Sequence, residues 1–182
     1  MNDMDKNIND LKVLISEGEI QEKLKTLAVQ IEQKFSANET IYVICVLKGS
    51  VMFCADLVKY MKNPIQMEFI RISSYGNETK SSNNLQAIDL TLPNLADKNV
   101  LIVEDIIDTG LTARFLTDLF KIKHHPKQVL FVSLLNKKCA RQIEIEPDFY
   151  GFEIDDKFVV GYGLDYKGYF RNLPYIGFFH KG

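Results

Sequence analysis

An α/β fold, with a mostly parallel twisted sheet flanked by helices, is predicted from the order of the apolar segments in this 182-residue sequence. Four runs are mostly apolar and rich in β-branched residues, as in buried strands. Helical segments separate them, and the order strand, helix, strand, strand, helix, strand is typical of a covered parallel sheet. The expected strands span 40–47, 65–72, 99–104 and 128–135.

Three helices are expected around these strands. In 16–35 the apolar residues recur at helical spacing, and Ser16 with Glu19 matches a capping box at its start. Segments 51–61 and 112–121 are expected to form the helices that follow the first and third strands.

The C-terminal part of the chain changes to short aromatic strands and turns, such as DFYGFEI and KFVVGYGLDY. Together with the N-terminal stretch, it is expected to form a small hood over one end of the sheet. A chain of this length fits one domain. We expect that domain to span 1–182, with its core at about 36–140 and the hood from about 1–15 and 145–182.

The composition is that of a globular protein with balanced charge: 46% hydrophobic, 25% charged and a net charge of −2. This gives no basis for broad binding of nucleic acid or anionic membranes. Cys45, Cys54 and Cys139 lack metal-ligand spacing, and we expect free thiols in a reducing compartment. A polar, acidic N-terminus and the lack of an apolar stretch of ~18–20 residues predict a cytoplasmic protein without a membrane span.

Residues 73–86 form a polar, Ser- and Asn-rich segment that is longer than most connections in a compact domain. Two interpretations stay open on composition alone. The segment is either a solvated surface loop or a lid that becomes ordered over a bound ligand.

The stretch VLIVEDIIDTGLT, residues 100–112, places three acids where a buried strand is expected to end. Ligands of open α/β sheets bind at this edge. Backbone N–H groups of 108–112, at a helix N-terminus, can bind a phosphate, while Glu104 and Asp105 can accept hydrogen bonds from vicinal hydroxyls. The pattern therefore indicates a sugar phosphate. It lacks the glycines and lysine of a P-loop, and GYGLDY lacks the third glycine of a dinucleotide fingerprint.

The same stretch resembles the phosphoribosyl-pyrophosphate (PRPP) signature of type I phosphoribosyltransferases, and its EDIIDTG form resembles that of the 6-oxopurine branch. Five further matches recur in the family's order and extend the resemblance from about residue 40 to 175. They are VLKGS (46–50), SSYG (73–76), SLLNKK (133–138), DKFVVGYGLDY (156–166) and YFRNLP (169–174).

The resemblance implies a Mg²⁺-dependent transfer of 5-phosphoribose from PRPP to N9 of hypoxanthine or guanine. The products would be IMP or GMP and pyrophosphate. It also implies a type I phosphoribosyltransferase fold and a homodimer or homotetramer. The partners would be PRPP and a 6-oxopurine base, with no nucleic acid and no membrane.

By the same resemblance, Glu104 and Asp105 would hold the ribose hydroxyls directly or through magnesium. Asp108 would be the general base that accepts the purine N7 proton; since an ordinary carboxylate is a weak base, it would act late, as charge develops on the ring. Leu111 departs from mammalian relatives, which carry Lys there, so phosphate affinity would depend more on backbone N–H groups. The 5′-phosphate contacts would come from Asp108, Thr109, Gly110, Leu111 and Thr112.

On the purine side, the resemblance places Lys137 at O6. An ammonium offers only donors, so it accepts a 6-oxo group and disfavours the 6-amino group of adenine. Phe158 would stack on the purine with Ile106 opposite, and Val159 would read the base through its backbone. Asp165 would reach magnesium through water and face the purine 2-position. The implied metal residues are Glu104, Asp105 and Asp165.

Lys48 and Gly49 match the pyrophosphate loop, where family structures carry a cis peptide before the lysine. Arg171 would supply charge to the leaving pyrophosphate. Ser74 and Tyr75 match the base of the family's lid, which favours the lid interpretation for 73–86.

Two other functions agree with part of the sequence. A non-catalytic regulator that senses PRPP or nucleotides on the same fold is disfavoured by Asp108 together with Lys137 and Phe158. A response-regulator-like receiver domain also gathers acids at strand ends, but it needs neither the aromatic tail nor the polar segment 73–86. Preference among hypoxanthine, guanine and xanthine is not readable from the sequence.

Overall fold

The computed structural model describes residues 10–75, 84–88 and 92–179. Its main sheet has six strands in the order β4-β3-β2-β5-β6-β7, with β4 antiparallel to β3 and the other pairs parallel. The strands are β2 (Ile41–Leu47), β3 (Ile65–Tyr75), β4 (Asn84–Ile88), β5 (Asn99–Ile107), β6 (Gln128–Asn136) and β7 (Phe149–Glu153).

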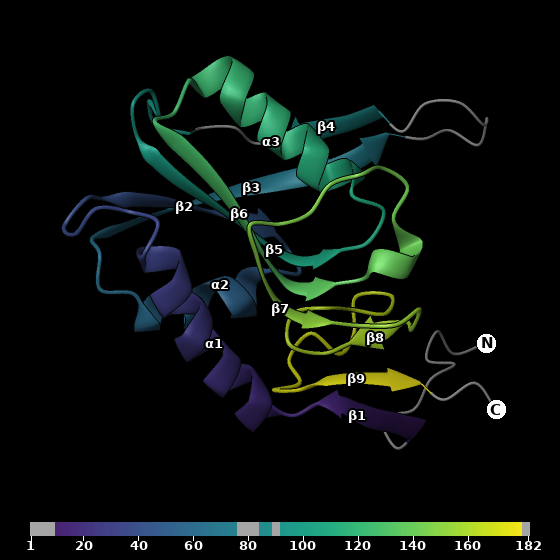
Figure 1. Ribbon diagram of the computed structural model, residues 1–182. Helices are drawn as coiled ribbons and strands as arrows, with labels where there is room; N and C mark the ends of the chain where they lie inside the picture. The colour runs from purple at the N-terminus through teal and green to yellow at the C-terminus, as the bar shows by residue number, and fades with distance from the viewer. Residues whose placement is uncertain (1–9, 76–83, 89–91, 180–182) are drawn as a thin grey trace.

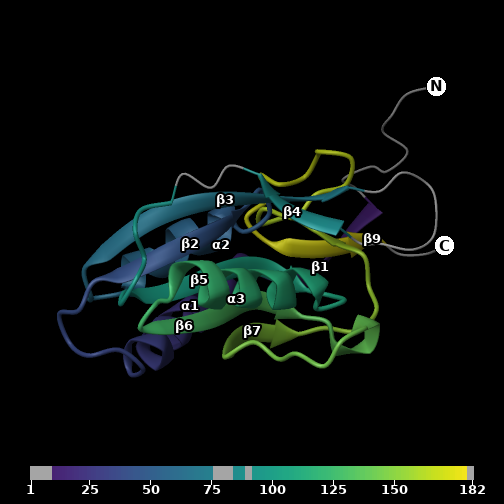
Figure 2. The same cartoon turned by 90° about the horizontal axis from the view of Figure 1, so that it is seen from above.

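A second, three-stranded antiparallel sheet has the order β1-β9-β8. Its strands are β1 (Leu11–Ile15), β8 (Val159–Val160) and β9 (Ile176–Phe179). Figures 1 and 2 both show it towards the side of the main sheet at which the arrowheads of β5 and β6 point. We call this small sheet, with the 161–175 segment between β8 and β9, the hood.

Helices cover both faces of the main sheet, with α1 and α2 on one face and α3 on the other (Figure 1). Their bounds are α1 (Glu17–Glu32), α2 (Val51–Leu57) and α3 (Leu111–His124), and short 3₁₀ helices follow α2 and β6 as η2 (Val58–Tyr60) and η3 (Lys138–Ala140). Within the described ranges, no helix has the length and apolarity to cross a membrane.

The predicted capping box at the start of α1 is confirmed. The Ser16 N–H donates to Glu19 Oε2 at 2.8 Å, and the Glu19 N–H donates to Ser16 Oγ at 3.3 Å. These bonds satisfy N–H groups that have no partner inside the helix.

Two hydrophobic cores explain why the central strand β5 begins as an unbroken apolar run. Leu101 and Val103 of β5 face the core under α1 and α2, whereas Val100 and Ile102 face the core under α3. Alternate side chains of a strand point to opposite faces, and both faces are buried here. The predicted α/β class and flanking helices are confirmed.

Two strands extend beyond their predicted bounds. β5 continues to Ile107, so Glu104 and Asp105 lie inside the strand. Glu104 pairs with Ser133 of β6, and Asp105 lies between paired residues. β3 continues to Tyr75 and pairs with β4, so both ends of the predicted loop 73–86 are strands. Hydrogen bonding to a neighbouring strand outweighs the polar composition that indicated a loop.

The predicted hood boundary at residue 145 differs from the structure. β7 pairs parallel with β6, with Val132 opposite Phe149, and so belongs to the main sheet. This pairing covers the outer edge of β6, whose backbone groups would otherwise lack partners. Only the part of the tail from β8 onward joins β1 in the hood.

Candidate active site

The carboxyl end of β5 forms the wall of a pocket of about 240 Å³. Its lining continues from the strand through the next turn into α3, and all but Ile107 and Ala113 are predicted site residues. The lining residues are Glu104, Asp105, Ile106, Ile107, Asp108, Thr109, Gly110, Thr112 and Ala113. The pocket lies at the edge of the sheet where ligands of parallel α/β folds bind.

Glu104 and Asp105 are held away from water. Glu104 is 7% exposed, and its Oε2 is buried without a hydrogen-bond partner in the described part of the chain. Burial, and then the negative charge of Asp105, raise the pKa of Glu104 well above its usual value. Burial raises the pKa of Asp105 to about 6, against the hydrogen bond from the Ile106 N–H at 2.9 Å. Perturbed carboxyl groups with an unsatisfied oxygen indicate a binding site.

The 108–112 turn presents the N-terminus of α3 to this pocket. Gly110 is the N-cap residue with φ +86°, and a Cβ there would lie 2.6 Å from Ile145 Cγ2, so the position requires glycine. The first turn of α3 contains no acidic side chain. Its N–H groups and the positive end of the helix dipole are therefore suited to a phosphate, beside Thr109 and Thr112.

Arg141 supports this turn from outside the pocket, which sequence reasoning missed. Its Nη1 donates to the Asp108 carbonyl at 3.0 Å, and its Nη2 donates to Asn136 Oδ1. Next to it, the Gln142 N–H donates to the Thr109 carbonyl at 3.0 Å. In the sequence, Arg141 is one basic residue among several, and no spacing or neighbour distinguishes it.

Lys137 lies beside the turn that carries Asp108. Its backbone N–H donates to the Ile107 carbonyl at 2.9 Å, which ties the end of β6 to the end of β5. Its side chain is 12% exposed and forms an ion pair with Asp156 at 2.7 Å. The hydrogen bond to Asp156, with a further contribution from the charge of Asp108, raises the pKa of Lys137. The predicted O6 contact and the predicted base are thus neighbours.

Phe158 is not a core residue, because 57% of it is exposed. Its ring meets that of Tyr166 edge to face, with centroids 5.9 Å apart. Val159 is buried in β8 and pairs with Phe178, so only its backbone could read a ligand. Ile106 is half-buried in the pocket wall on β5. An exposed aromatic ring of this kind is suited to stacking on a planar base.

Lys48 and Gly49 follow β2, and the Leu47–Lys48 peptide bond is cis, as the resemblance implied. Lys48 is exposed, whereas Gly49 is buried against the carboxylate of Asp105: a Cβ on Gly49 would lie 1.5 Å from Asp105 Oδ2. Gly163 of the hood approaches equally closely, since its Cβ would lie 2.0 Å from the Gly49 carbonyl oxygen. Glycine at both positions allows three segments to meet.

Asp165 and Arg171 form an ion pair within the hood, with Nη2 and Oδ1 2.5 Å apart. Arg171 Nη1 also donates to the Gly163 carbonyl at 2.5 Å, and the Gly168 N–H donates to Asp165 Oδ2 at 2.7 Å. The negative charge of Asp165 helps to raise the pKa of Asp105, and the positive charge of Arg171 opposes that rise. Both hood residues therefore lie within electrostatic reach of the pocket.

The three predicted metal residues are not gathered into one cluster. In the described residues, no group of three or more His, Cys, Asp or Glu side chains is arranged to hold a metal ion. Asp165 is instead paired with Arg171.

For the predicted lid, the structure gives the backbone of Ser74 and Tyr75 as the end of β3. Their side chains, and residues 76–83, lie outside what the structure describes.

Comparison with known proteins agrees with this arrangement. The model of a family described as "Phosphoribosyl transferase domain" matches residues 16–167. The hypoxanthine-guanine phosphoribosyltransferase of Bacillus subtilis (strain 168) is 45% identical over 166 residues, 91% of each chain.

Solved structures agree as well. A hypoxanthine-guanine phosphoribosyltransferase from Bacillus anthracis has a TM-score of 0.86 at 46% identity, covering 92% of this chain and 97% of that one. The Trypanosoma cruzi hypoxanthine phosphoribosyltransferase, in complex with the product IMP, has a TM-score of 0.88 at 33% identity, covering 96% and 97%. On its fold, its pocket and these matches, the chain belongs to the phosphoribosyltransferase family, in the branch of the hypoxanthine-guanine enzymes.

Proposed function

We propose that this protein is a purine salvage enzyme that transfers 5-phosphoribose from PRPP to N9 of hypoxanthine or guanine, giving IMP or GMP and pyrophosphate. The observation that carries the proposal is one continuous pocket wall. It runs from two buried acids, Glu104 and Asp105, through Asp108 to the N-terminus of α3. Those groups match, in order, the hydroxyls of a ribose, the nitrogen edge of a base and a 5′-phosphate.

Asp108 is the general base of this proposal, and Lys137 beside it receives O6. As N9 of the base attacks C1′, the bond from C1′ to the pyrophosphate oxygen breaks, and the N7 proton passes to the Asp108 carboxylate. The proximity of Lys137 to Asp108 supports placing the six-membered ring and N7 at the same side of the pocket. Phe158 offers its exposed ring to the face of the purine.

A magnesium ion fits the donor set of this site. Carboxylate oxygens are its preferred ligands, and Glu104 offers a buried oxygen that has no partner among the residues the structure describes. Glu104 and Asp105, with Asp165 through water, are the residues we propose to hold it. Magnesium, when bound, supplies positive charge to the oxygens of PRPP and of the departing pyrophosphate. Lys48 and Arg171 add cationic donors, and Gly49 lets the loop approach Asp105 closely.

Further parts of the proposal concern the whole chain. We propose a single catalytic domain over 1–182 that acts in the cytoplasm as a homodimer or homotetramer. We also propose that 73–86, with Ser74 and Tyr75 at its base, closes over PRPP and excludes water during the transfer.

A direct assay tests the proposal. The protein is incubated with PRPP and Mg²⁺ and offered hypoxanthine, guanine, xanthine or adenine separately. We expect IMP and GMP with equimolar pyrophosphate, and no AMP. An Asp108→Asn variant, with an unchanged circular dichroism spectrum, should lose at least about a hundredfold in turnover, within the usual range for a lost general base. Absence of IMP and GMP with the wild-type protein would contradict the proposed function, and near-normal turnover of Asp108→Asn would remove Asp108 from it.

A further inference from the structure

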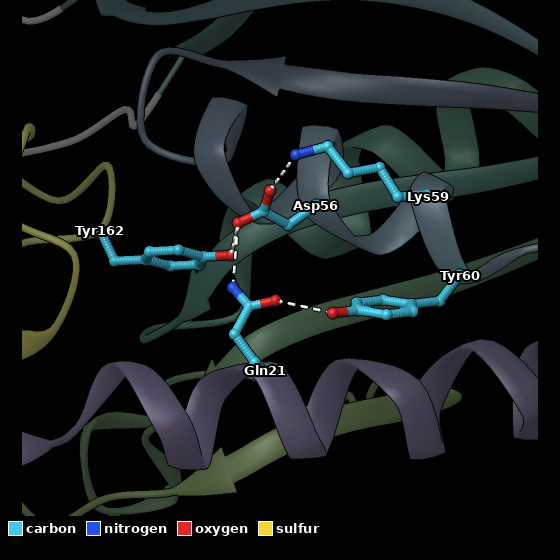
Figure 3. A network of polar contacts seen from close by, with 5 residues as sticks. All are labelled: Gln21, Asp56, Lys59, Tyr60 and Tyr162. Carbon is cyan, nitrogen blue, oxygen red and sulfur yellow. Dashed lines mark hydrogen bonds and ion pairs between the residues drawn. The ribbon is translucent and has the colours of Figure 1, made fainter.

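A polar network away from the pocket connects the hood to the helices that cover the main sheet (Figure 3). Tyr162 of the hood donates its hydroxyl to Asp56 Oδ2 at 2.7 Å, and Gln21 Nε2 donates to the same oxygen at 3.2 Å. Lys59 pairs with Asp56 Oδ1 at 2.6 Å, and the Tyr60 hydroxyl donates to Gln21 Oε1 at 3.0 Å. Figure 3 shows the five side chains converging from α1, from α2 with η2, and from the hood.

Asp56 is the acceptor around which this network is built. Burial alone would raise the pKa of Asp56, but the hydrogen bonds from Lys59, Tyr162 and Gln21 together hold it below its usual value. Burial, and then the bond to Asp56, raise the pKa of Tyr162. The phenol therefore remains a donor to a carboxylate, a charge-assisted bond of the stronger kind.

Tyr162 lies in a turn whose backbone is close to the pocket. The residue is 5% exposed, and its backbone N–H donates to the Leu173 carbonyl at 2.8 Å. The next residue, Gly163, is the one that packs on the Gly49 carbonyl, and Gly49 in turn packs on the Asp105 carboxylate. We call residues 161–165 the hood turn.

The hood turn contacts the loop–helix segment 48–57 at two separate points. At one point, Gly163 packs on Gly49 of the pyrophosphate loop. At the other, the Tyr162 hydroxyl reaches Asp56, in the last turn of α2. Loop and helix form one unit, because the Cys54 N–H donates to the Ser50 carbonyl at 2.8 Å. Two contacts on one unit constrain both the position and the tilt of the turn, in addition to the packing of Val159 and Leu164 in the core.

We propose that Tyr162 is a positioning residue for pyrophosphate binding: its hydroxyl, held by Asp56, fixes the hood turn against residues 48–49. The turn ends at Asp165, and Arg171, which pairs with Asp165 and with the Gly163 carbonyl, follows it. A turn of altered tilt displaces these groups relative to Lys48 and Gly49. The inference rests on the proposed function only in assigning PRPP pyrophosphate to this region.

The test is the Tyr162→Phe variant, which keeps the buried ring and removes one hydroxyl. We expect the KM for PRPP and the inhibition constant of inorganic pyrophosphate each to rise about tenfold, the order of one charge-assisted hydrogen bond. The kcat and the KM for hypoxanthine should stay within about twofold of the wild-type values. The proposed purine contacts, Lys137 and Phe158, lie outside the hood turn. Hypoxanthine is the substrate of choice because it lacks the 2-amino group that the Asp165 backbone would face.

Tyr60→Phe is the matched control. It removes a phenol hydroxyl from the same network, but from η2 and from a bond to Gln21. We expect both variants to lower the melting temperature, Tyr162→Phe by more because its bond is charge-assisted, and only Tyr162→Phe to change the PRPP and pyrophosphate constants. Asp56→Asn, which keeps an oxygen that can accept from Tyr162, should be closer to wild type in the KM for PRPP than Asp56→Ala.

Two outcomes would overturn the inference: a Tyr162→Phe enzyme with the PRPP and pyrophosphate constants of the wild type, or equal constants for Tyr162→Phe and Tyr60→Phe. If Tyr162→Phe fails to fold, equal KM values for PRPP in Asp56→Asn and Asp56→Ala would overturn it instead. Failure of the proposed function is a different result, since the wild-type protein would then form no IMP at all.

Discussion

Glu104 and Asp105 show at the scale of single residues how this site favours a ligand. Burial raises the pKa of both carboxyl groups, the negative charge of Asp105 raises that of Glu104 further, and Glu104 Oε2 has no partner among the described residues. Such a pair is costly in the empty protein and is relieved by hydroxyl or cationic partners. The residue types and their order were visible in the sequence. Their burial was not, because the strand was expected to end at Glu104 and instead continues to Ile107.

The raised pKa of Asp105 predicts a pH effect on stability. Between about pH 4 and pH 6 the folded protein holds a proton at Asp105 that the unfolded chain releases. The free energy of unfolding therefore falls as the pH rises through this range, by an amount of the order of 1–3 kcal/mol. Urea denaturation from pH 4 to 7, without substrate or magnesium, measures this free energy. It should fall less with rising pH for Asp105→Asn than for the wild type. At pH 7 the variant should also be the more stable protein. Identical pH slopes for the two proteins would refute this explanation.

Lys137 and Lys138 provide a second test at this scale, because the chain offers an adjacent control. Lys137 is mostly buried near Asp108, whereas Lys138 is half exposed and pairs with the exposed Glu153 at 2.8 Å. Lys137→Ala should raise the KM for hypoxanthine by about ten- to a hundredfold, as expected for a lost hydrogen bond from a charged donor. Lys138→Ala should leave it within about twofold. Steady-state kinetics of the two variants measures these KM values. Equal KM values for Lys137→Ala and Lys138→Ala would mean that O6 does not bind at Lys137.

At the scale of elements, the junction of β5 with α3 determines where a phosphate can bind. The helix begins at Leu111, and the left-handed backbone of its N-cap residue, Gly110, turns the chain from the strand into the helix. Segment 137–143 supports the turn through Arg141 and Gln142. The strand, the turn and the helix could each be predicted from periodicity and from the DTG sequence. The support from Arg141 could not, since the contact joins residues 33 positions apart.

Gly110→Ala tests this junction against Gly168→Ala. Both glycines have φ +86°, but a Cβ at 110 would clash with Ile145, whereas one at 168 meets nothing within 4 Å in the described ranges. Each change should cost about 1–2 kcal/mol of stability from backbone strain. Gly110→Ala should lose further stability because of the clash with Ile145. Only this variant should weaken IMP binding, by tenfold or more, in calorimetric titration. Unchanged IMP affinity in Gly110→Ala would argue against phosphate binding at this turn.

Other elements show that sequence patterns predict local structure better than they predict which strands pair. The capping box of Ser16 and Glu19 was predicted correctly because it depends on neighbours in the chain. The pairing of β3 with β4, and of β7 with β6, depends on strand edges that must find partners. A polar segment, and a short aromatic one, gave no sign of which edge they would join.

For the whole molecule, the site arises where two sheets meet. The main sheet supplies the acids, the phosphate-binding turn and Lys137, and the hood supplies Asp165 and Arg171, with Phe158 directly before β8. The class of fold followed from the apolar runs, and the family from motifs along most of the chain. Contacts between distant parts, such as Gly163 with Gly49 or Tyr162 with Asp56, have no local sequence signal, because they depend on how the hood packs on the sheet.

A crystal structure of this protein with IMP tests the central claim most directly. We predict the 5′-phosphate at the backbone N–H groups of 109–112, the ribose hydroxyls at Glu104 and Asp105, and O6 at the Lys137 ammonium. The purine ring should lie against Phe158. A phosphate bound away from the N-terminus of α3, or a base that does not reach Lys137, would contradict the site described for this chain.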